Sequence, residues 1–566
     1  MKRGVFIAIL VIVVVLVALF VVGGLIYMQF TQEPYIPDQA YLKIDVSGPL
    51  VESSTPGLSG VFGSELLSIR DLWFQLERAA MDKRIKGVIL KINYFDGGFA
   101  KTEEIGRLLE RFRQSKKPVV AMLEDGGLKE YYLSSFADKV VIFRGAWLSI
   151  KGIAAEAMFL KNTLAKLGVQ AEMFHIGDYK TGYNAFTENK MTPAHRESMQ
   201  ALIDDIYQAL INGIARNRKL DAAAVRRVLD QSPLPIQDYL KAGFVDAIGT
   251  NDELRQWLKN EHPLVKFATY RKTSSPNPFN GPKKIAIIFA SGEIRSGKSG
   301  SDSVFGGEVL GSDSLVEELR SARTSSMIKA VVLRVDSPGG SAVASDVILR
   351  EAEELAKKKP LVLSMSDMAA SGGYWISMAS TKILTLPETI TGSIGVLSGK
   401  FVLKGLYDKL GVSKEFVSTS PYAVMYSDYR PFTPAERGKI MADMQRVYDE
   451  FLKKVAANRS KSTAEVDKIG RGRVWSGDAA LRLNLVDGIG GLADAVAEAK
   501  KLAKIPTAEV VGVRIYPRKR SLIDLILQLG GDASARPTLL DIETRIRSLA
   551  KNYFPALRMP FVLQLN

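Results

Sequence analysis

Short runs of Val, Ile and Leu alternate with longer amphipathic stretches along most of the chain. One section reads "AVVLRV", "ASDVILREAEELAKK", "PLVLSM" and then a small-residue stretch that opens near Ala370. Short apolar runs predict strands that are buried on both faces, and the apolar spacing of the longer stretches predicts helices. The order strand, helix, strand, helix predicts βαβ units, and therefore an α/β fold with a mostly parallel sheet.

The pattern occurs twice, because several segments of the first half reappear in the second. The paired segments are "IKGVILKINYFDGG" with "IKAVVLRVDSPGG", "KKPVVAML" with "KKPLVLSM", two copies of "KLGV", and "MTPAHRESM" with "FTPAERGKI". Pro118 and Pro360 lie 242 positions apart (360 − 118), and the other pairs have similar separations. Self-similarity at a fixed spacing predicts a tandem duplication.

The two copies meet at the Pro-, Ser- and Asn-rich linker "RKTSSPNPFNGP" (271–282). We predict a first repeat over residues 31–275 and a second repeat over residues 283–515. The linker has no apolar periodicity, so we expect each repeat to hold its own core. The Gly- and Ser-rich segment 291–314 predicts a mobile loop, which could cover a substrate.

The first 30 residues contain an uncharged apolar run over residues 4–30. About 20 apolar residues span the hydrocarbon core of a bilayer, so we predict a transmembrane anchor within residues 1–30. Lys2 and Arg3 precede the run, which predicts a cytoplasmic start and a body on the outer side. Gly23 and Gly24 leave a cleaved signal as the alternative, although its apolar region would be shorter.

The predicted C-terminal tail, residues 516–566, starts with a basic cluster followed by Leu and Ile at helical spacing, "YPRKRSLIDLILQLGG". This pattern is typical of an amphipathic helix. Such a helix can pack on its own domain or a neighbour, or it can contact lipid, and the sequence leaves both open.

Composition narrows the possible chemistry. The chain has no cysteine, which excludes thiolate catalysis, disulfides and Cys-ligated zinc. It has three histidines and no HExxH motif, so a histidine-based triad or a zinc peptidase is poorly supported, and we predict no metal and no cofactor. The net charge of +15 is scattered along the chain, which favours an anionic membrane surface over nucleic acid as a partner.

Ser371 lies among alanines and glycines in "SMSDMAASGGYW", directly after a predicted strand. Small residues suit a helix packed closely on a sheet, and they also suit a nucleophile that needs open space. The segments "DSPGGS" and "DMAASGG" both follow predicted strands. Because parallel strands present their working loops at their carboxyl ends, we expect these two loops to face one pocket.

A serine that transfers an acyl group needs a base and backbone N–H donors for the oxyanion. Gly339 and Gly340 can present N–H groups without side chains, and Gly372 stands at a predicted helix start, where N–H groups are unsatisfied. Since histidine is scarce, we predict a lysine base. Burial would have to lower its pKa from about 10.4 towards roughly 7–8.

Four segments together resemble the signal peptide peptidase A family, also called protease IV: "VDSPGGSAVASD", "MAASGGYWIS", "PETITGSIGV" and "IGDYKTGYNAFTENKMTP". The resemblance covers nearly the whole chain, including the apolar N-terminus and the duplication. It implies a tandem crotonase-like fold, related to the Clp protease, with a serine–lysine dyad. Ser371 matches the nucleophile and Lys180 matches the base, while Gly339 or Gly340 matches an oxyanion donor.

The duplication offers an internal check on this dyad. Counting back 242 positions from Ser371 gives Lys129, and Ala423 stands opposite Lys180. Each repeat therefore keeps one member of the dyad and lacks the other. On this basis we expect activity only when both repeats are present.

Other residues remain as alternatives. Ser393 in "TGSIGV" is a second candidate nucleophile, or else a pocket wall, and Lys190 is a second candidate base. A hydroxyl group that orients the lysine is expected but is not assigned. We interpret the remaining candidates as ordinary polar, turn or helix residues: His175, His195, Ser337, Ser341 and Ser377.

The resemblance implies a membrane-anchored serine endopeptidase that degrades cleaved signal peptides at the bacterial inner membrane, with its catalytic body on the periplasmic side. It also implies a homo-oligomer, with a tetramer as the expected form. The alternatives are an acyl-CoA hydratase or thioesterase on the same fold, and a non-enzymatic membrane scaffold. An external location argues against the first, and the presence of both dyad residues argues against the second.

Overall fold

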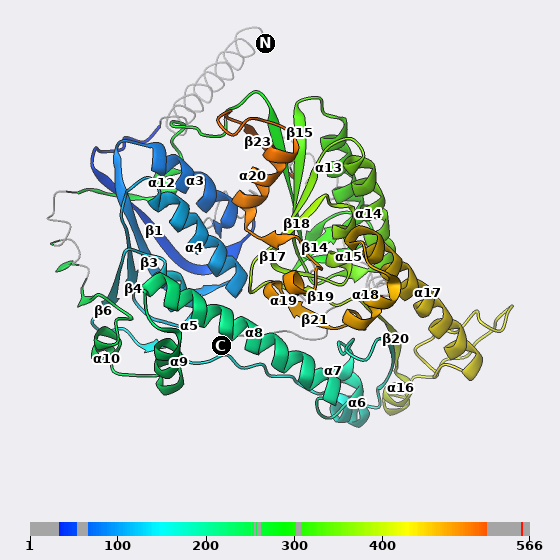
Figure 1. The fold of residues 1–566 in the computed structure, drawn as a ribbon. Helices are drawn as coiled ribbons and strands as arrows, with labels where there is room; N and C mark the ends of the chain where they lie inside the picture. The colour runs from blue at the N-terminus through cyan, green and yellow to red at the C-terminus, as the bar shows by residue number, and fades with distance from the viewer. Residues whose placement is uncertain are drawn as a thin grey trace, which may run out of the picture.

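The computed structural model describes residues 33–53, 66–250, 262–301 and 307–517, together with 252–253, 256 and 556–557. The predicted anchor, residues 1–30, and most of the predicted tail lie outside these residues. Within the described part of the chain, no helix is both long enough and apolar enough to cross a membrane. Figure 1 shows two sheets side by side, each covered by helices.

The sheet of the first repeat is parallel and has the strand order β10-β1-β3-β4-β6-β9, with β2 paired to β1. Its strands are β1 (Ala40–Val51), β2 (Leu67–Ser68), β3 (Ile85–Asp96), β4 (Val119–Leu123), β6 (Lys139–Phe143), β9 (Ala247–Gly249) and β10 (Leu264–Lys266). A short parallel pair, β5 (Gly126–Gly127) with β7 (Leu148–Ser149), lies apart from this sheet.

The second repeat follows the same plan, with a parallel path β23-β11-β15-β17-β18-β22. Next to it, β19 also pairs with β17 and carries the antiparallel β21. These strands are β11 (Lys284–Ser291), β15 (Ile328–Ser337), β17 (Leu361–Ala370), β18 (Lys382–Thr385), β19 (Ile390–Gly392), β21 (Val474–Ser476), β22 (Gly488–Ile489) and β23 (Gly512–Tyr516). The two repeats therefore share one strand order, as expected for a duplication.

The helices also correspond. The first repeat contains α3 (Ile69–Met81), α4 (Phe99–Arg113), α5 (Leu128–Ser135), α6 (Lys161–Leu167), α7 (Asn184–Thr187), α8 (Pro193–Arg218), α9 (Ala222–Gln231), α10 (Ile236–Lys241) and α12 (Phe267–Tyr270). The second contains α13 (Ser312–Thr324), α14 (Ala342–Ala356), α15 (Gly372–Trp375), η1 (Ile376–Ala379), α16 (Lys404–Leu410), α17 (Pro434–Arg459), α18 (Thr463–Ile469), α19 (Gly477–Arg482) and α20 (Leu492–Leu502).

The repeated motifs are helix caps. In both copies of "TPA" the threonine is the N-cap of a 26-residue helix, α8 or α17, and its hydroxyl accepts a backbone N–H while proline occupies the first turn. In both copies of "KLGV" the glycine ends a short helix with a positive φ, 81° at Gly168 and 71° at Gly411. The same capping residues therefore start or end corresponding helices in both repeats.

The second repeat has a core cluster of its own, but the core of the first repeat extends onto the second sheet. Ile285 and Ile287 on β11 belong to the same buried cluster as Leu72 and Leu109 of the first repeat, whereas their neighbours on β11 face the core of the second repeat. Successive side chains of a strand point to opposite faces, so one face of the second sheet completes the core of the first repeat. Separated repeats would expose this apolar face.

The segment predicted as a mobile loop, 291–314, forms strands where the structure describes it: β12 (Glu293–Arg295), β13 (Gly300–Ser301) and β14 (Glu308–Gly311). They join a small sheet of order β13-β14-β12-β16-β24, which includes β16 (Gly340–Ser341) and β24 (Ala556–Leu557). Backbone pairing of β12 with β16 orders this segment beside the "SPGG" turn.

Residues 151–192, which we call the arm, carry part of the first repeat over to the second. The arm starts with residues 151–160, which form no helix or strand, and contains α6, α7 and β8 (Gln170–Ile176). There β8 pairs antiparallel with β20 (Val396–Val402) of the second repeat. Helix α8 then runs back along the lower edge of the molecule to the first repeat (Figure 1).

Candidate active site

Lys180 reaches the second repeat because of the arm. It lies just after β8, and Ser393 lies just before β20, the strand that pairs with β8. The Tyr179 N–H donates to the Arg471 carbonyl oxygen at 2.9 Å, which holds the lysine segment against the loop before β21. Gly472 in that loop has φ +81°, and a Cβ atom there would lie 2.4 Å from the Lys180 Cβ. A glycine is needed for this close approach.

Ser371 directly follows β17 and is the N-cap of α15, so it lies between a strand and a helix as the sequence predicts. Its backbone has φ 56° and ψ −113°, a conformation that non-glycine residues rarely adopt and that costs of the order of 1–3 kcal/mol. The Ser371 N–H donates to the Gly392 carbonyl oxygen at 2.9 Å, which holds the turn in place. In this strained turn from strand to helix, the Ser371 hydroxyl group makes no capping hydrogen bond to α15.

The Lys180 amine contacts two serines. Its Nζ lies 2.8 Å from Ser371 Oγ, 2.9 Å from Ser393 Oγ and 2.7 Å from the Ser393 carbonyl oxygen. All three residues have 0% exposed surface. Ser393 also has a positive φ, 53°. The two serines predicted as rival nucleophiles therefore lie on either side of one amine.

The electrostatics favour a neutral amine. Among the described residues, Lys180 has no carboxylate partner, so burial alone lowers the pKa of its amine well below the usual lysine value. An unprotonated amine can accept a hydrogen bond from Ser371 Oγ–H and take up its proton, as a general base requires. Lys180 and Ser371 have the geometry and the environment of a nucleophile–base pair.

The glycines of the "SPGG" turn lie beside Ser371. A Cβ atom on Gly372 would lie 3.1 Å from the Gly340 nitrogen, and one on Gly340 would lie 2.1 Å from the Ile294 carbonyl oxygen. The Gly339 N–H donates to Ser337 Oγ at 3.1 Å within its own turn, so it is already used. The N–H groups of Gly340 and Gly372 are therefore the better candidates for oxyanion donors.

The remaining sequence candidates lie elsewhere. Lys190 and His175 are exposed on the arm, and His195 is buried in the first turn of α8. The hydroxyl groups of three serines contact backbone groups. Ser337 Oγ donates to the Gly292 carbonyl oxygen, Ser341 caps α14, and Ser377 Oγ donates to the Gly373 carbonyl oxygen.

The corresponding positions of the other repeat do not form a second site. Lys129, which stands opposite Ser371, points its ammonium group to the Phe95 carbonyl oxygen at 2.6 Å. Ala423, which stands opposite Lys180, is exposed in a turn after β20. Among the described residues, Lys180 and Ser371 therefore meet once, between the arm of one repeat and the strand ends of the other.

The sequence does not single out Gly472, and it predicts Ser393 as a nucleophile or a pocket wall, not as a partner of the lysine. One signal was available for Ser393: it lies in a glycine-flanked segment of the second repeat, three residues before a predicted strand. The sequence does not show that this strand pairs with the arm.

A family model described as peptidase family S49 matches the chain twice, over residues 111–264 and 353–506. The two matches are displaced by 242 positions (353 − 111 and 506 − 264), which is the spacing read from the sequence, and together they cover more than half of the chain. The chain belongs to peptidase family S49.

Curated relatives agree with this S49 assignment. A chloroplastic serine protease SPPA from Arabidopsis thaliana is 34% identical over 82% of this chain and 70% of its own length. Protease 4 from Salmonella typhi is 32% identical over 82% of this chain and 78% of its own. Protease 4 from Haemophilus influenzae is 32% identical over 79% and 74%. The chain is a serine peptidase.

The solved structures add little. A ClpP1 mutant from Listeria monocytogenes aligns with 37% of the chain at a TM-score of 0.24 and 16% identity, a similarity too low to assign a fold.

Proposed function

We propose that this S49 peptidase is a membrane-anchored endopeptidase that degrades cleaved signal peptides with a Ser371–Lys180 dyad. The observation that carries the dyad is the 2.8 Å contact between Lys180 Nζ and Ser371 Oγ, which is fully buried and has no carboxylate beside it in the described part of the chain. Support for the substrate comes from the four motifs quoted above and from the apolar run at residues 4–30, which would keep the site close to the membrane.

In the proposed reaction, Ser371 Oγ attacks the carbonyl carbon of the scissile peptide bond while the neutral amine of Lys180 takes the hydroxyl proton. The N–H groups of Gly340 and Gly372 stabilise the negative oxygen of the tetrahedral intermediate. Lys180 then gives its proton to the leaving amine, which yields an acyl-enzyme. A water molecule, deprotonated by the same amine, hydrolyses the acyl-enzyme and restores the Ser371 hydroxyl.

An extended peptide has a binding edge next to this site. Strand β16 pairs on one side with β12, and its other edge carries the antiparallel strand β24 at Gly340 and Ser341, whose place a substrate strand would take. We propose that a substrate binds this edge as an added strand. Main-chain hydrogen bonds would then supply affinity with little dependence on side chains. Such binding suits signal peptides, whose apolar segments differ in sequence.

In the proposed organisation, residues 1–30 anchor the chain, 31–275 supply the base, 283–515 supply the nucleophile and 516–566 form a tail. The catalytic body lies on the periplasmic side of the inner membrane and acts as a homo-oligomer, with peptides and lipid as its partners. These assignments rest on the apolar N-terminus, its preceding Lys2 and Arg3, and the resemblance of the motifs.

The substrate class is tested with the full chain in detergent and two synthetic peptides of equal length, a released signal peptide and a polar scrambled peptide without an apolar core. Mass spectrometry of the products should show cleavage within the apolar core of the signal peptide, at a higher kcat/KM than for the control. Equal cleavage of both peptides would argue against signal peptides as the preferred substrate. Hydrolysis of an acyl-CoA thioester in place of peptides would support the alternative enzyme.

A Ser393→Ala variant tests the second serine. We expect kcat to fall about 3- to 10-fold, because Lys180 loses one orienting hydrogen bond but keeps the Ser393 carbonyl oxygen and Ser371 Oγ. A serine-directed phosphonate should still label Ser371. Loss of labelling together with a loss of activity as large as that expected for Ser371→Ala would instead identify Ser393 as the nucleophile.

A further inference from the structure

Two carboxylates stand at the bases of the two catalytic loops. Asp336 opens the "DSPGG" turn at the end of β15, and Asp367 opens "DMAAS" at the end of β17. The two loops also touch directly, because the Met368 N–H donates to Asp336 Oδ1 at 3.2 Å. Any shift of these carboxylates relative to each other would move the oxyanion glycines relative to Ser371.

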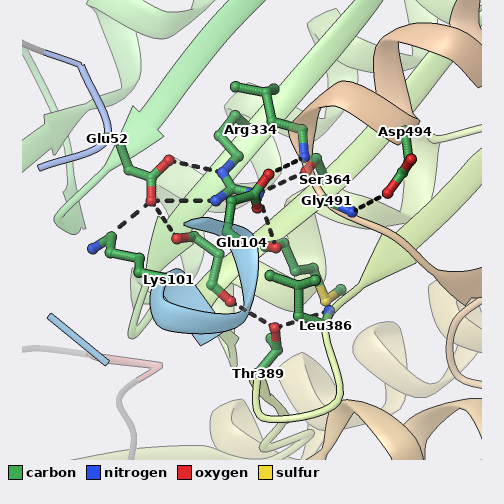
Figure 2. Close-up of polar contacts among 12 residues, drawn as sticks. Glu52, Lys101, Glu104, Arg334, Ser364, Leu386, Thr389, Gly491 and Asp494 are labelled. Carbon is green, nitrogen blue, oxygen red and sulfur yellow. Dashed lines mark hydrogen bonds and ion pairs between the residues drawn. The ribbon is translucent and has the colours of Figure 1, made fainter. Parts of the chain in front are cut away.

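One ammonium group from the first repeat joins the two carboxylates. Lys101, on α4, is 8% exposed, and its Nζ lies 2.6 Å from Asp336 Oδ2 and 3.2 Å from Asp367 Oδ2. A third carboxylate, Glu52, lies 3.8 Å away. Figure 2 shows Lys101 beside Glu52, at the edge of a buried network in which Glu52 also contacts Arg334 of the second repeat.

The backbone of the first repeat holds Asp367 as well. The N–H groups of Gly98 and Lys101 each donate to this carboxylate at 2.9 Å. They belong to the first turn of α4, a 15-residue helix whose N-terminus favours negative charge. Gly98 is the counterpart of Gly340 (340 − 98 = 242). In the first repeat, the turn equivalent to the proposed oxyanion turn therefore binds a carboxylate of the second repeat, Asp367.

The Lys101 ammonium group balances the negative charge of the three carboxylates around it. The carboxylates of Asp336, Asp367 and Glu52 hold the pKa of Lys101 well above its usual value, although burial alone would lower it. Burial, with Asp367 and Glu52, raises the pKa of Asp336 to about 6 even though Lys101 acts to lower it. Arg334 does not replace Lys101, because its guanidinium group contacts Glu52 and Glu104. Without the ammonium group, Asp336 and Asp367 would lose the charge that joins them, so they would either repel each other or take up a proton.

We propose that Lys101 is a positioning residue of the peptidase site: by bridging Asp336 and Asp367, it holds the Gly340 turn and the Ser371 turn at the separation that the tetrahedral intermediate requires. The inference rests on the proposed function. It gives the first repeat a second role in the reaction, in addition to supplying Lys180. The position equivalent to Lys101 in the second repeat is Val343 (343 − 101 = 242), so this role belongs to one repeat alone.

The test compares Lys101→Met with Lys101→Met/Asp336→Asn in the full chain, after active-site titration with a fluorophosphonate. For Lys101→Met, kcat per titrated site should fall roughly 10- to 100-fold while KM changes less than about threefold, because the reacting groups are misplaced and peptide binding is not. The double variant should recover most of this loss, since asparagine removes one repelling charge and keeps an acceptor for Met368. Lys91→Met removes a half-exposed ion pair with Glu124 in the same repeat and should change neither constant.

A wild-type kcat per titrated site in Lys101→Met would overturn the proposal, and so would a double variant that is no faster than the single one. If Lys101→Met does not fold, Lys101→Arg decides, because it keeps the charge but displaces it. The proposal then requires a loss of at least about threefold, and an unchanged kcat rejects it. Ser371→Ala, measured in parallel, separates the two hypotheses. Turnover retained in that variant rejects the proposed function, whereas an inactive Ser371→Ala beside a fully active Lys101→Met rejects the positioning role alone.

Discussion

Replacing Ser371 by alanine is expected to lower peptide turnover by at least about 10⁴-fold, because the variant has no oxygen to form the acyl-enzyme. The fold should survive, since the turn at Ser371 is held by its backbone N–H bond to Gly392 and its side chain caps no helix. Turnover of a purified peptide and thermal unfolding, measured on the same preparation, separate loss of chemistry from loss of structure.

Ser377→Ala is the matched control for this variant. Ser377 is equally buried and lies six residues further along the chain, in η1, but its hydroxyl group donates to the Gly373 carbonyl oxygen and does not contact Lys180. Its turnover should stay within about threefold of wild type. If Ser371→Ala kept measurable peptidase activity at a similar level, Ser371 would not be the nucleophile.

Lys180→Met is expected to lose turnover by a similar factor, of the order of 10⁴, since the pair works as a unit. Because burial depresses the Lys180 pKa, the wild-type kcat/KM should rise with pH as this amine loses its proton, in a range below the ordinary lysine value of 10.5. The variant should show no such rise. High pH should not rescue it, because it lacks a positioned base.

Lys400→Met controls for the removal of a buried lysine. Lys400 is 3% exposed, and burial lowers its pKa to about 8, but its amine donates to the carbonyl oxygens of Met425 and Ser427, away from Ser371. It should keep turnover within about threefold and keep the pH dependence. An acidic limb that persisted in Lys180→Met would show that another group accepts the proton.

The features that could be predicted from the sequence depend on short stretches of chain. Buried strands such as β4 are continuous apolar runs, and the "TPA" motifs start helices because threonine and proline satisfy the first turn locally. Because the chain is duplicated, sequence patterns such as the "TPA" cap occur twice. Ser371 could be singled out for the same reason, since its small neighbours and its position at a strand end are visible in a dozen residues.

The features that could not be predicted depend on contacts between distant segments. Ser393 meets Lys180 only because β8 crosses over to pair with β20, and Lys101 reaches Asp336 only because the two repeats pack together. The shared core has the same origin, since Ile285 and Ile287 alternate with residues of the other face in an unbroken apolar run. A run that is buried on both faces does not reveal which neighbour covers each face.

The most direct test of the dyad is the rate at which a fluorophosphonate labels the full chain, with the modified residue mapped by mass spectrometry, in wild type and Lys180→Met. We expect the label on Ser371 in the wild type, at a rate that increases with pH, and almost no labelling of that serine in Lys180→Met. A label on Ser393, or labelling of Ser371 at the wild-type rate in the absence of Lys180, would contradict a Ser371–Lys180 dyad.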